Sequence, residues 1–436
     1  MKMSVEPTWA ETIKNLRRSE MDRNIEHLSP EDLNQWQAEL LQSTINRVYE
    51  RVPFYRKLMD EAGIGPEEIK GLEDITRLPF TTRQELAANY PYDHFAVPLK
   101  DIIRIHVFPG VHERPVVRGY TRADVLARQE LVTRFLKACG VGPEDIVQIC
   151  LERGMAVWGE ELRQGAESLG AVVIPPDPVS PANQLLVMGD FKTSVLITTP
   201  SYGLHLLDWL RENGVKKPLF LRRGIFVGET LTDSARRELE EGFGIEALSG
   251  YGIIEAAGPG MAYECEARDG LHLAADHIIA EIIDPESQAP LPPGEEGELV
   301  VTTLSVKANP LIRFRTGDRT KIIPEKCPCG RTTPRIAPIS GRTDELLVIR
   351  GVKLSREILG KLISQTLKER EVSFEVEIKT RRHLQTLEIK IAMSPDIFVE
   401  SIPGLHQRLS QVEAAILETV GLPVKVTFVE ATSRNG

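Results

Sequence analysis

IVQIC at residues 146–150 is the first of four short apolar runs that decide the fold. The other three are AVVIPP (171–176), SVLITTP (194–200) and LFLRRGIFVG (219–228). Apolar runs of this length are typical of buried strands. Segments with helical spacing of apolar residues separate them, at 155–169, 181–190 and 201–213. Because strands that alternate with helices form parallel sheets covered by helices, we expect an α/β fold.

The sequence on either side of this region predicts two further parts. SPEDLNQWQAELLQSTINRVYERV (29–52) begins with a cap-like serine and keeps apolar residues at helical spacing, so the N-terminal part reads as helical. After residue 340, alternating runs and helix-like segments predict a small α+β domain. We therefore expect two domains, 1–340 and 341–436, with the boundary at Gly341–Asp344.

Composition excludes several classes of protein. The 436 residues include 53 Lys and Arg and 63 Asp and Glu, for a net charge of −10, which argues against a nucleic-acid or membrane-surface partner. No apolar run reaches the ~18 residues of a membrane span, and the polar N-terminus lacks the apolar core of a signal peptide. Five cysteines are few and odd in number, so we expect no disulfide framework and a cytoplasmic location.

Eight segments, in order along the chain, carry a family signature. They are RVYERVPFYRKLMDEAGI (47–64), LPFTTRQELAANYP (78–91), TTPSYGL (198–204), SGYGIIEAAGPGMAYECEARDGLHLAADHIIAEIIDP (249–285), GELVVTTL (297–304), LIRFRTGDRT (311–320), CPCGRTTPRI (327–336) and GRTDELLVIRGVK (341–353). Together they resemble the phenylacetate–CoA ligase family of the adenylate-forming superfamily. So many ordered matches are far more specific than any single motif.

The resemblance implies a fold and a reaction. The fold is a large, multi-layer N-terminal α/β domain with a small, mobile α+β C-terminal domain. The implied chemistry first joins a carboxylic acid to ATP, giving acyl-adenylate and pyrophosphate, and then passes the acyl group to the thiol of CoA. Such chemistry needs cationic and N–H donors around the phosphates together with a divalent ion.

The resemblance also assigns roles to individual residues. Tyr251-Gly252-Ile253-Ile254-Glu255 matches the family element Tyr-Gly-x-Ser/Thr-Glu, in which Glu255 would hold Mg²⁺ against the nucleotide phosphates. Ile254 stands where the family has a hydroxyl, so one polar contact to phosphate is lost. Asp318 would accept hydrogen bonds from the ribose hydroxyls.

Five further positions follow from the same resemblance. Gly228 and Glu229 would form the turn beside adenine, Arg342 and Asp344 match the hinge segment, and Gly351 lies on the loop that approaches CoA. The alternative for every one of these positions is an ordinary surface or loop residue.

The phosphate loop departs from the family pattern. Where the family has Ser-Ser-Gly-Thr-Thr-Gly-Lys-Pro, this chain has Phe108-Pro109-Gly110-Val111-His112-Glu113-Arg114-Pro115. Loops of this kind bind phosphate through backbone N–H groups and hydroxyls. Pro109 removes one N–H and Glu113 adds a carboxylate, which repels a phosphate charge 4 Å away by ~1 kcal/mol in water. The loop therefore predicts poor binding of pyrophosphate.

The end of the chain is the second departure. The family closes with a Gly-Lys segment whose lysine assists adenylation, whereas this chain ends PVKVTFVEATSRNG, with Lys425 inside the apparent last strand. Both departures touch the same half-reaction, so we expect ATP-dependent adenylation to be weak or absent. Ordinary drift within a working ligase is the alternative.

Four residues form a candidate metal site. Cys265 and His272 stand seven apart, and Cys327 and Cys329 form a Cys-Pro-Cys-Gly turn. A Cys3His set suits a closed tetrahedral zinc site with a structural role. The alternative is four unlinked residues; His277 is a spare ligand candidate.

The resemblance places the acid near TTPSYGL and GYGIIEAAGPG. Tyr202, Ala256, Ala257 and Pro259 would then form a flat apolar pocket suited to an aryl acid, or else belong to the core. LERGMAVWGEELRQG (151–165) replaces a Gly-rich, aromatic family segment, so acid specificity is expected to differ.

These observations predict an acyl- or aryl-CoA ligase-like enzyme that acts on an acid or its CoA thioester. CoA is expected as a cofactor. ATP or AMP with Mg²⁺ is a second possible cofactor, for which weakened binding is expected. Two alternatives remain open: an ATP-independent acyltransferase from CoA to the phosphopantetheine of an acyl carrier protein, and a non-catalytic protein that binds nucleotide or acyl-CoA. The resemblance also suggests a homodimer.

Overall fold

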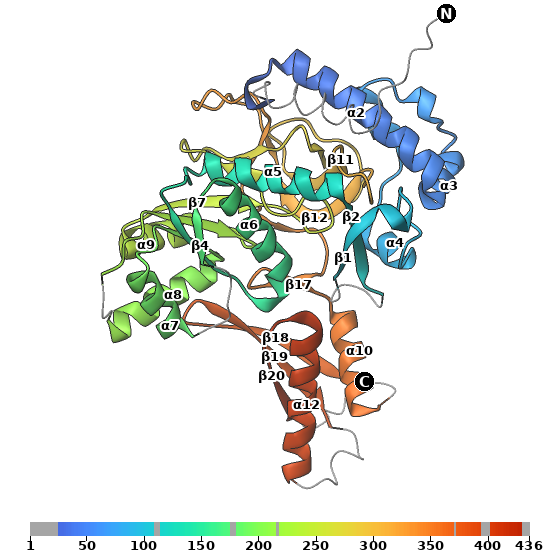
Figure 1. The fold of residues 1–436 in the computed structure, drawn as a ribbon. Coiled ribbons are helices and arrows are strands. Elements are labelled where there is room, and N and C mark those ends of the chain that lie inside the picture. Colours follow the sequence, from blue (N-terminus) through green and yellow to red (C-terminus); the bar gives the residue numbers. More distant parts are fainter. Residues whose placement is uncertain are drawn as a thin grey trace, which may run out of the picture.

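The computed structural model describes residues 25–108, 114–174, 180–214, 218–369, 372–393 and 402–429. A large body carries a smaller C-terminal unit that projects from one side of it (Figure 1). No helix within these ranges is long and apolar enough to cross a bilayer.

A nine-stranded sheet forms the centre of the body, in the order β13-β14-β9-β8-β7-β6-β5-β3-β4. Its parallel half holds the apolar runs that the sequence predicted as strands, and it confirms the α/β fold. The strands are β3 (Ile146–Cys150), β4 (Val172–Ile174), β5 (Val195–Thr198), β6 (Arg223–Val227), β7 (Glu246–Tyr251), β8 (Ala262–Glu264), β9 (Leu271–Leu273), β13 (Ile322–Ile323) and β14 (Arg335–Ile336).

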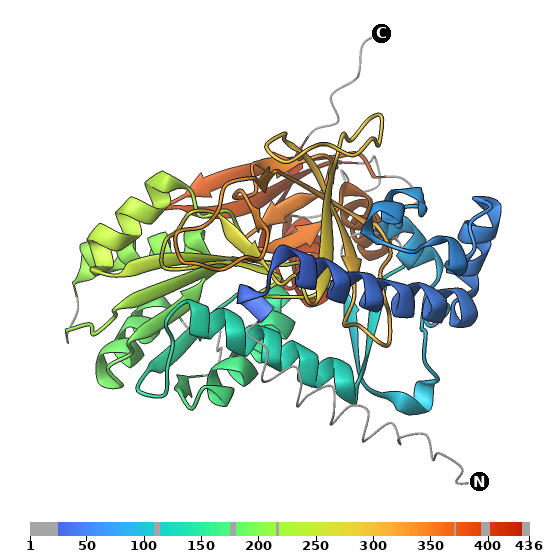
Figure 2. The same ribbon diagram turned by 90° about the horizontal axis from the view of Figure 1, so that it is seen from above.

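Helices cover both faces of this sheet because successive strand residues point in opposite directions. Val195 and Ile197 pack with residues of α5 and α6, whereas Leu196 lies between them in sequence and packs with residues of α7, α8 and α9. Figure 2 shows the two helical layers on either side of the sheet. The helices are α5 (Arg122–Ala138), α6 (Ala156–Ser168), α7 (Pro181–Asp190), α8 (Pro200–Asn213) and α9 (Asp233–Phe243).

Side-chain caps start four of these helices, α5, α7, α8 and α9. The hydroxyl of Thr199 accepts a hydrogen bond from the backbone N–H of Tyr202 at the start of α8, and Thr232 serves α9 in the same way. Such caps satisfy backbone N–H groups that have no partner inside the helix.

Smaller sheets and N-terminal helices complete the body. One sheet has the order β10-β11-β12-β15, and a two-stranded sheet pairs β1 with β2. Their bounds are β1 (Ile102–Phe108), β2 (Val116–Thr121), β10 (Ile278–Ile283), β11 (Gly297–Thr303), β12 (Phe314–Thr320) and β15 (Gly341–Arg342). The helices are α2 (Pro30–Arg51), α3 (Pro53–Glu61), α4 (Arg83–Ala88), and the short η1 (Ile25–His27), η2 (Pro66–Glu68), η3 (Leu72–Arg77), η4 (Leu99–Asp101) and η5 (Arg153–Met155).

The C-terminal unit has its own sheet, β18-β19-β20, with α10 and α12 beside it. A hairpin of β16 and β17 reaches from this unit toward the body (Figure 1). The bounds are β16 (Leu347–Ile349), β17 (Val352–Leu354), α10 (Arg356–Leu367), β18 (Phe374–Arg381), β19 (Leu384–Ala392), α12 (Ile402–Val420) and β20 (Val424–Val429). Gly341 and Arg342 still pair with β12 of the body, so the chain leaves the body after them.

Candidate active site

A cleft of about 1280 Å³ opens between the body and the C-terminal unit. Its lining comes from both parts: Gly228, Tyr251 and Asp318 belong to the body, and Gly351 and Lys353 to the hairpin of the C-terminal unit. Several residues that the sequence assigned to nucleotide and CoA therefore face one space.

Tyr251 and Asp318 form the centre of the site. Tyr251 ends β7 and donates a hydrogen bond of 2.7 Å from its hydroxyl to Oδ2 of Asp318 on β12. The guanidinium of Arg342 on the neighbouring strand β15 pairs with Oδ1 of the same carboxylate. Burial, followed by the negative charge of Asp318, raises the pKa of Tyr251 well above its ordinary value, so its hydroxyl stays a donor.

Arg342 also fixes the predicted hinge residue. Its Nε lies 2.6 Å from Oδ1 of Asp344, and its Nη2 lies 2.5 Å from Oδ2. This two-point contact is the strong geometry for a guanidinium and a carboxylate. Asp318, Arg342 and Asp344 thus form one chain of ion pairs at the exit from the body.

Glu255 lies beside this network in a buried ion pair with Arg83, the first residue of α4. Nε of Arg83 is 2.6 Å from Oε1 of Glu255. Burial opposes ionisation, but the charges of Arg83 and Lys353 outweigh it and lower the pKa of Glu255 to about 2. Oε2 of Glu255 and Nη2 of Arg83 are buried without a hydrogen-bond partner in the described part of the chain. A carboxylate oxygen with no partner fits a Mg²⁺ ligand, and a guanidinium N–H with no partner fits phosphate.

Lys353 brings a third cation to this place. Its Nζ lies 3.7 Å from Oδ2 of Asp318 and is shielded from solvent, with no hydrogen-bond partner among the described residues. Burial lowers the pKa of Lys353, and the carboxylate of Asp318 opposes that effect.

Gly228 and Glu229 form the turn after β6. Gly228 has a φ of +82°, which favours glycine, and it lines the cleft. Glu229 accepts hydrogen bonds from the backbone N–H and the hydroxyl of Ser201, at 3.0 and 2.9 Å. Burial raises the pKa of Glu229 despite these bonds.

The four residues predicted for the acid lie away from the lining of the cleft. Ala256 and Ala257 belong to the core cluster around β8 and β11, Pro259 is buried, and Tyr202 packs against the core beneath α8. The apolar lining of the cleft instead includes Met155, Val157, Trp158 and Ile254, with Val107, Phe108 and Val116. The assignment of the four to the acid stays a prediction.

The two predicted departures lie only partly within the described structure. Pro109, Gly110, Val111, His112 and Glu113 lie outside it, whereas Phe108 and Val116 at the ends of β1 and β2 line the cleft. Lys425 lies in β20, and its Nζ is 3.9 Å from Glu388, so it belongs to a strand as expected. Residues 430–436 lie outside the described structure.

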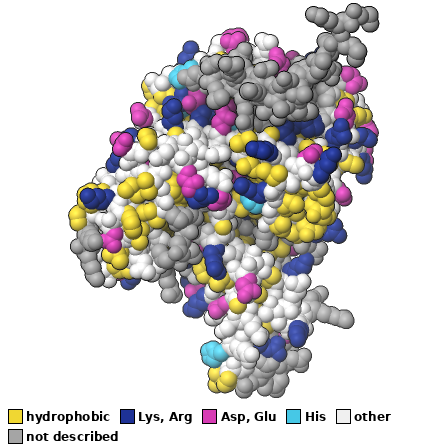
Figure 3. Space-filling model, in the orientation of Figure 1, with side chains coloured by type: hydrophobic (Ala, Val, Ile, Leu, Met, Phe, Trp, Pro, Cys, Tyr) yellow, Lys and Arg dark blue, Asp and Glu magenta, His cyan; other side chains and the backbone are white. Residues whose placement is uncertain are grey.

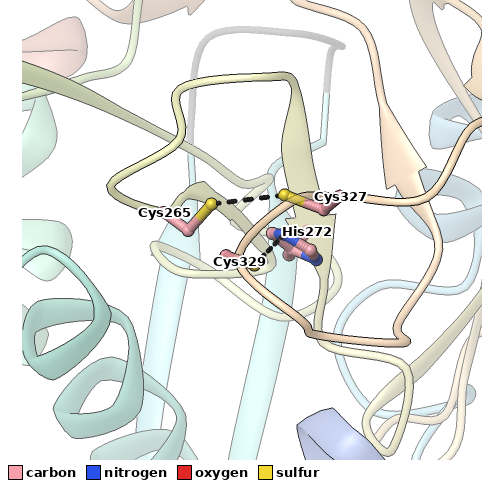
Figure 4. Close-up of side chains that lie close together, drawn as sticks. All are labelled: Cys265, His272, Cys327 and Cys329. Carbon is pink, nitrogen blue, oxygen red and sulfur yellow. Dashed lines mark hydrogen bonds between the residues drawn. The ribbon is translucent and has the colours of Figure 1, made fainter.

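Cys265, His272, Cys327 and Cys329 converge in the body, and their ligand atoms all lie within 4.8 Å of one another (Figure 4). Sγ of Cys265 is 3.6 Å from Sγ of Cys327, and Sγ of Cys329 is 3.4 Å from Nε2 of His272. Four ligands about 2.0–2.3 Å from a central zinc would have separations of this size.

The surroundings of the cluster also suit a metal. Nδ1 of His272 lies 3.1 Å from the hydroxyl of Thr333, the kind of contact that orients a ligating histidine. His277 stands apart, with Nδ1 2.7 Å from the hydroxyl of Ser305.

Comparison with known proteins decides the family. The family described as AMP-binding enzyme matches residues 164–307. The phenylacetate-coenzyme A ligase of Thermus thermophilus is 36% identical over 419 residues, covering 93% of this chain and 94% of the relative. The enzyme of the same name from Escherichia coli is 36% identical over 414 residues, covering 94% and 93%. The chain belongs to the phenylacetate–CoA ligase family. It is an acid–thiol ligase of the adenylate-forming superfamily, as the sequence motifs predicted.

Solved structures add the arrangement of the two parts. The 2-hydroxyisobutyryl-CoA ligase in complex with 2-HIB-AMP and CoA, in the thioesterification state, matches this ligase with a TM-score of 0.86 and 26% identity, over 94% of this chain and 89% of the other. The same protein in an open conformation gives a TM-score of 0.65, with coverage of 92% and 89%. The arrangement of the two parts is therefore more similar to that thioesterification state than to that open conformation.

Sequence reasoning missed two cations of the site. Arg83 was quoted within TTRQEL but given no role, and Lys353 closes the segment that supplied the hinge residues. Both have charged neighbours far away in sequence: Arg83 and Glu255 are 172 positions apart. A basic residue beside a family motif was the only signal available.

Proposed function

We propose that this ligase joins an aryl or acyl carboxylic acid to CoA through an acyl-adenylate. The observation that carries the proposal is the convergence of Tyr251, Glu255 and Asp318 on one cleft, with buried polar atoms that lack partners among the described residues. Asp318 would hold the ribose. Oε2 of Glu255 would hold Mg²⁺, which supplies charge neutralisation at the phosphates when bound.

In the first step, a carboxylate oxygen of the acid bonds to the α-phosphorus of ATP, and pyrophosphate leaves with the electron pair of the broken P–O bond. The departures at residues 108–115 and after Lys425 led us to expect little of this step. Two observations favour a working adenylation. Arg83 offers a buried N–H beside Glu255, and relatives at 36–37% identity over about nine-tenths of the chain are named ligases.

The decisive experiment supplies ATP, Mg²⁺, CoA and a panel of aryl and short acyl acids, and measures AMP and acyl-CoA together. The proposal predicts equal amounts of both products for at least one acid. Acyl transfer from a synthetic CoA thioester to a holo-carrier protein without AMP would favour the acyltransferase instead. Binding of AMP or CoA without any product would favour the non-catalytic alternative.

We further propose that zinc occupies the Cys3His cluster and that Asp344 is the hinge between domains 1–340 and 341–436. The cluster links the segment after β8 to the segment before β14, so zinc would hold the two together. Asp344 follows the last residues that pair with the body.

We also propose a homodimer, for which the outer face of β1 is the supporting surface. Ile103 and Ile105 are exposed there, and Figure 3 shows apolar side chains gathered on that side of the molecule. Contiguous exposed apolar surface often marks an interface. Light scattering of the protein and of an Ile103→Glu, Ile105→Glu variant tests this; a monomeric wild type would contradict it. The cytoplasmic location stays a prediction.

A further inference from the structure

The ammonium of Lys353 has no hydrogen-bond partner among the described residues, although it is shielded from solvent. A lysine has three N–H donors, and burying such a cation without partners is unfavourable. Its nearest carboxylate oxygen, Oδ2 of Asp318, is 3.7 Å away, which is too long for a hydrogen bond.

The neighbouring carboxylates already have closer donors. Asp318 accepts from the hydroxyl of Tyr251 and pairs with Arg342, Asp344 pairs with Arg342, and Glu255 pairs with Arg83. Two cationic groups near Glu255 therefore keep unused N–H donors: Nζ of Lys353, which lines the cleft, and Nη2 of Arg83, which lies outside the cleft lining. Two such donors match an anion with several acceptor oxygens.

The chain brings these two cations from different parts. Arg83 begins α4 of the body, whereas Lys353 lies on β17 of the C-terminal unit. Lys353 can meet Asp318 only while the C-terminal unit sits as described, and that arrangement resembles the thioesterification state of the solved relative.

We infer that Lys353 is a catalytic residue of the second half-reaction only, where its ammonium binds the phosphate of the acyl-adenylate and of the departing AMP. The inference rests on the proposed function. The sulfur of CoA bonds to the acyl carbon, the bond from that carbon to the phosphate oxygen breaks, and AMP leaves with the electron pair. The thiol proton passes to solvent. Lys353 donates to the phosphate oxygens, on which negative charge grows as AMP leaves.

A first test reads the phosphate contact without any turnover. Calorimetry compares AMP with adenosine on the wild type, on Lys353→Met and on Lys353→Arg. We expect Lys353→Met to lower the affinity for AMP at least tenfold and to change the affinity for adenosine less than twofold. Lys353→Arg should regain most of the affinity for AMP. The inference would be overturned if Lys353→Met lowered the affinities for AMP and adenosine equally, or lowered neither.

A second test separates the half-reactions. Acid-dependent pyrophosphate exchange measures adenylation, and single turnover of synthetic acyl-adenylate with CoA measures thioester formation. Lys353→Met should slow thioester formation at least tenfold and change exchange less than twofold. The control is Lys390→Met, a half-exposed lysine on β19 that pairs with Glu377 at 3.1 Å, and it should change neither rate. An equal loss of rate in both half-reactions for Lys353→Met would contradict the inference without contradicting the proposed ligase activity. A wild type that makes no thioester would instead overturn the proposed function.

Discussion

Gly228 and Gly351 lie backbone against backbone where the C-terminal unit meets the body. A Cβ built on Gly228 would lie 3.3 Å from the Cα of Gly351, and a Cβ on Gly351 would lie 2.3 Å from Sδ of Met155. Their φ angles are +82° and +80°. Both residues are therefore held to glycine by conformation, whereas the flexible end of the Met155 side chain would have to move to admit a methyl group.

Gly351→Ala should disturb the thioester-forming arrangement. The added methyl would have to displace Met155 and adopt an unfavourable φ, so we expect thioester formation to fall about tenfold, the equivalent of about 1.4 kcal/mol. Pyrophosphate exchange should change little. Gly142→Ala is the matched control, because a Cβ there meets nothing within 4 Å and its φ is not in the left-handed region. Equal loss of both half-reactions in Gly351→Ala would contradict the expectation.

Glu255→Gln should destabilise the fold as well as reduce activity. The change leaves the buried guanidinium of Arg83 without its closest carboxylate, which costs about 3 kcal/mol in comparable buried pairs. Urea unfolding measures this loss. Glu238→Gln serves as control, because its ion pair with Arg211 is exposed and should be worth less than about 1 kcal/mol. Similar losses in the two variants would show that Glu255 has no special structural role.

Cys265→Ser should remove zinc. We expect one zinc per wild-type chain by elemental analysis, a large loss of zinc in the variant and a lower thermal midpoint, because a structural metal stabilises only the folded state. Cys139→Ser, a buried cysteine outside the cluster, should keep its zinc even if it lowers stability. A wild type purified without any metal would contradict the zinc assignment.

Trp158→Gly should widen the range of acids. Trp158 lines the cleft and is 6% exposed, so its removal opens space beside Met155 and Val157. We expect kcat/KM for bulkier aryl acids to rise relative to small acids by about tenfold, the size of the discrimination that a pocket wall usually provides. An unchanged ratio of the kcat/KM values for bulky and small acids would indicate that the acid binds elsewhere. Leu362→Ala in α10, outside the cleft lining, is the control.

Stability should fall as the pH drops from about 6.5 to about 4, partly because of His106. Burial, with Arg104 and other nearby arginines, lowers the pKa of His106 to about 4. In this pH window the imidazole of His106 is protonated in the unfolded chain but neutral in the folded chain. Protonation therefore favours unfolding. His106→Gln should reduce the loss of unfolding free energy between pH 7 and 5 by about 1 kcal/mol, after allowance for partial solvent exposure. The exposed His27→Gln is the control, and an unchanged slope in His106→Gln would refute the assignment.

Local patterns predicted much of the fold. The strand and helix runs between residues 146 and 228 carry their periodicity in adjacent residues, and the strands β3, β5 and β6 are buried on both faces. The grouping of Cys265 and His272 with Cys327 and Cys329 followed from residue type and from their spacing along the chain. Family motifs located Tyr251, Glu255 and Asp318.

The sequence by itself therefore determined the α/β class and the family, and it predicted which residues meet nucleotide. Only the tertiary structure decided which charges meet one another. Arg83 pairs with Glu255 across 172 positions, and Lys353 approaches Asp318 only because a hairpin of the C-terminal unit enters the cleft. The physical reason is that the burial of a charge depends on what packs around it, and these neighbours come from separate elements that only the docked fold brings together.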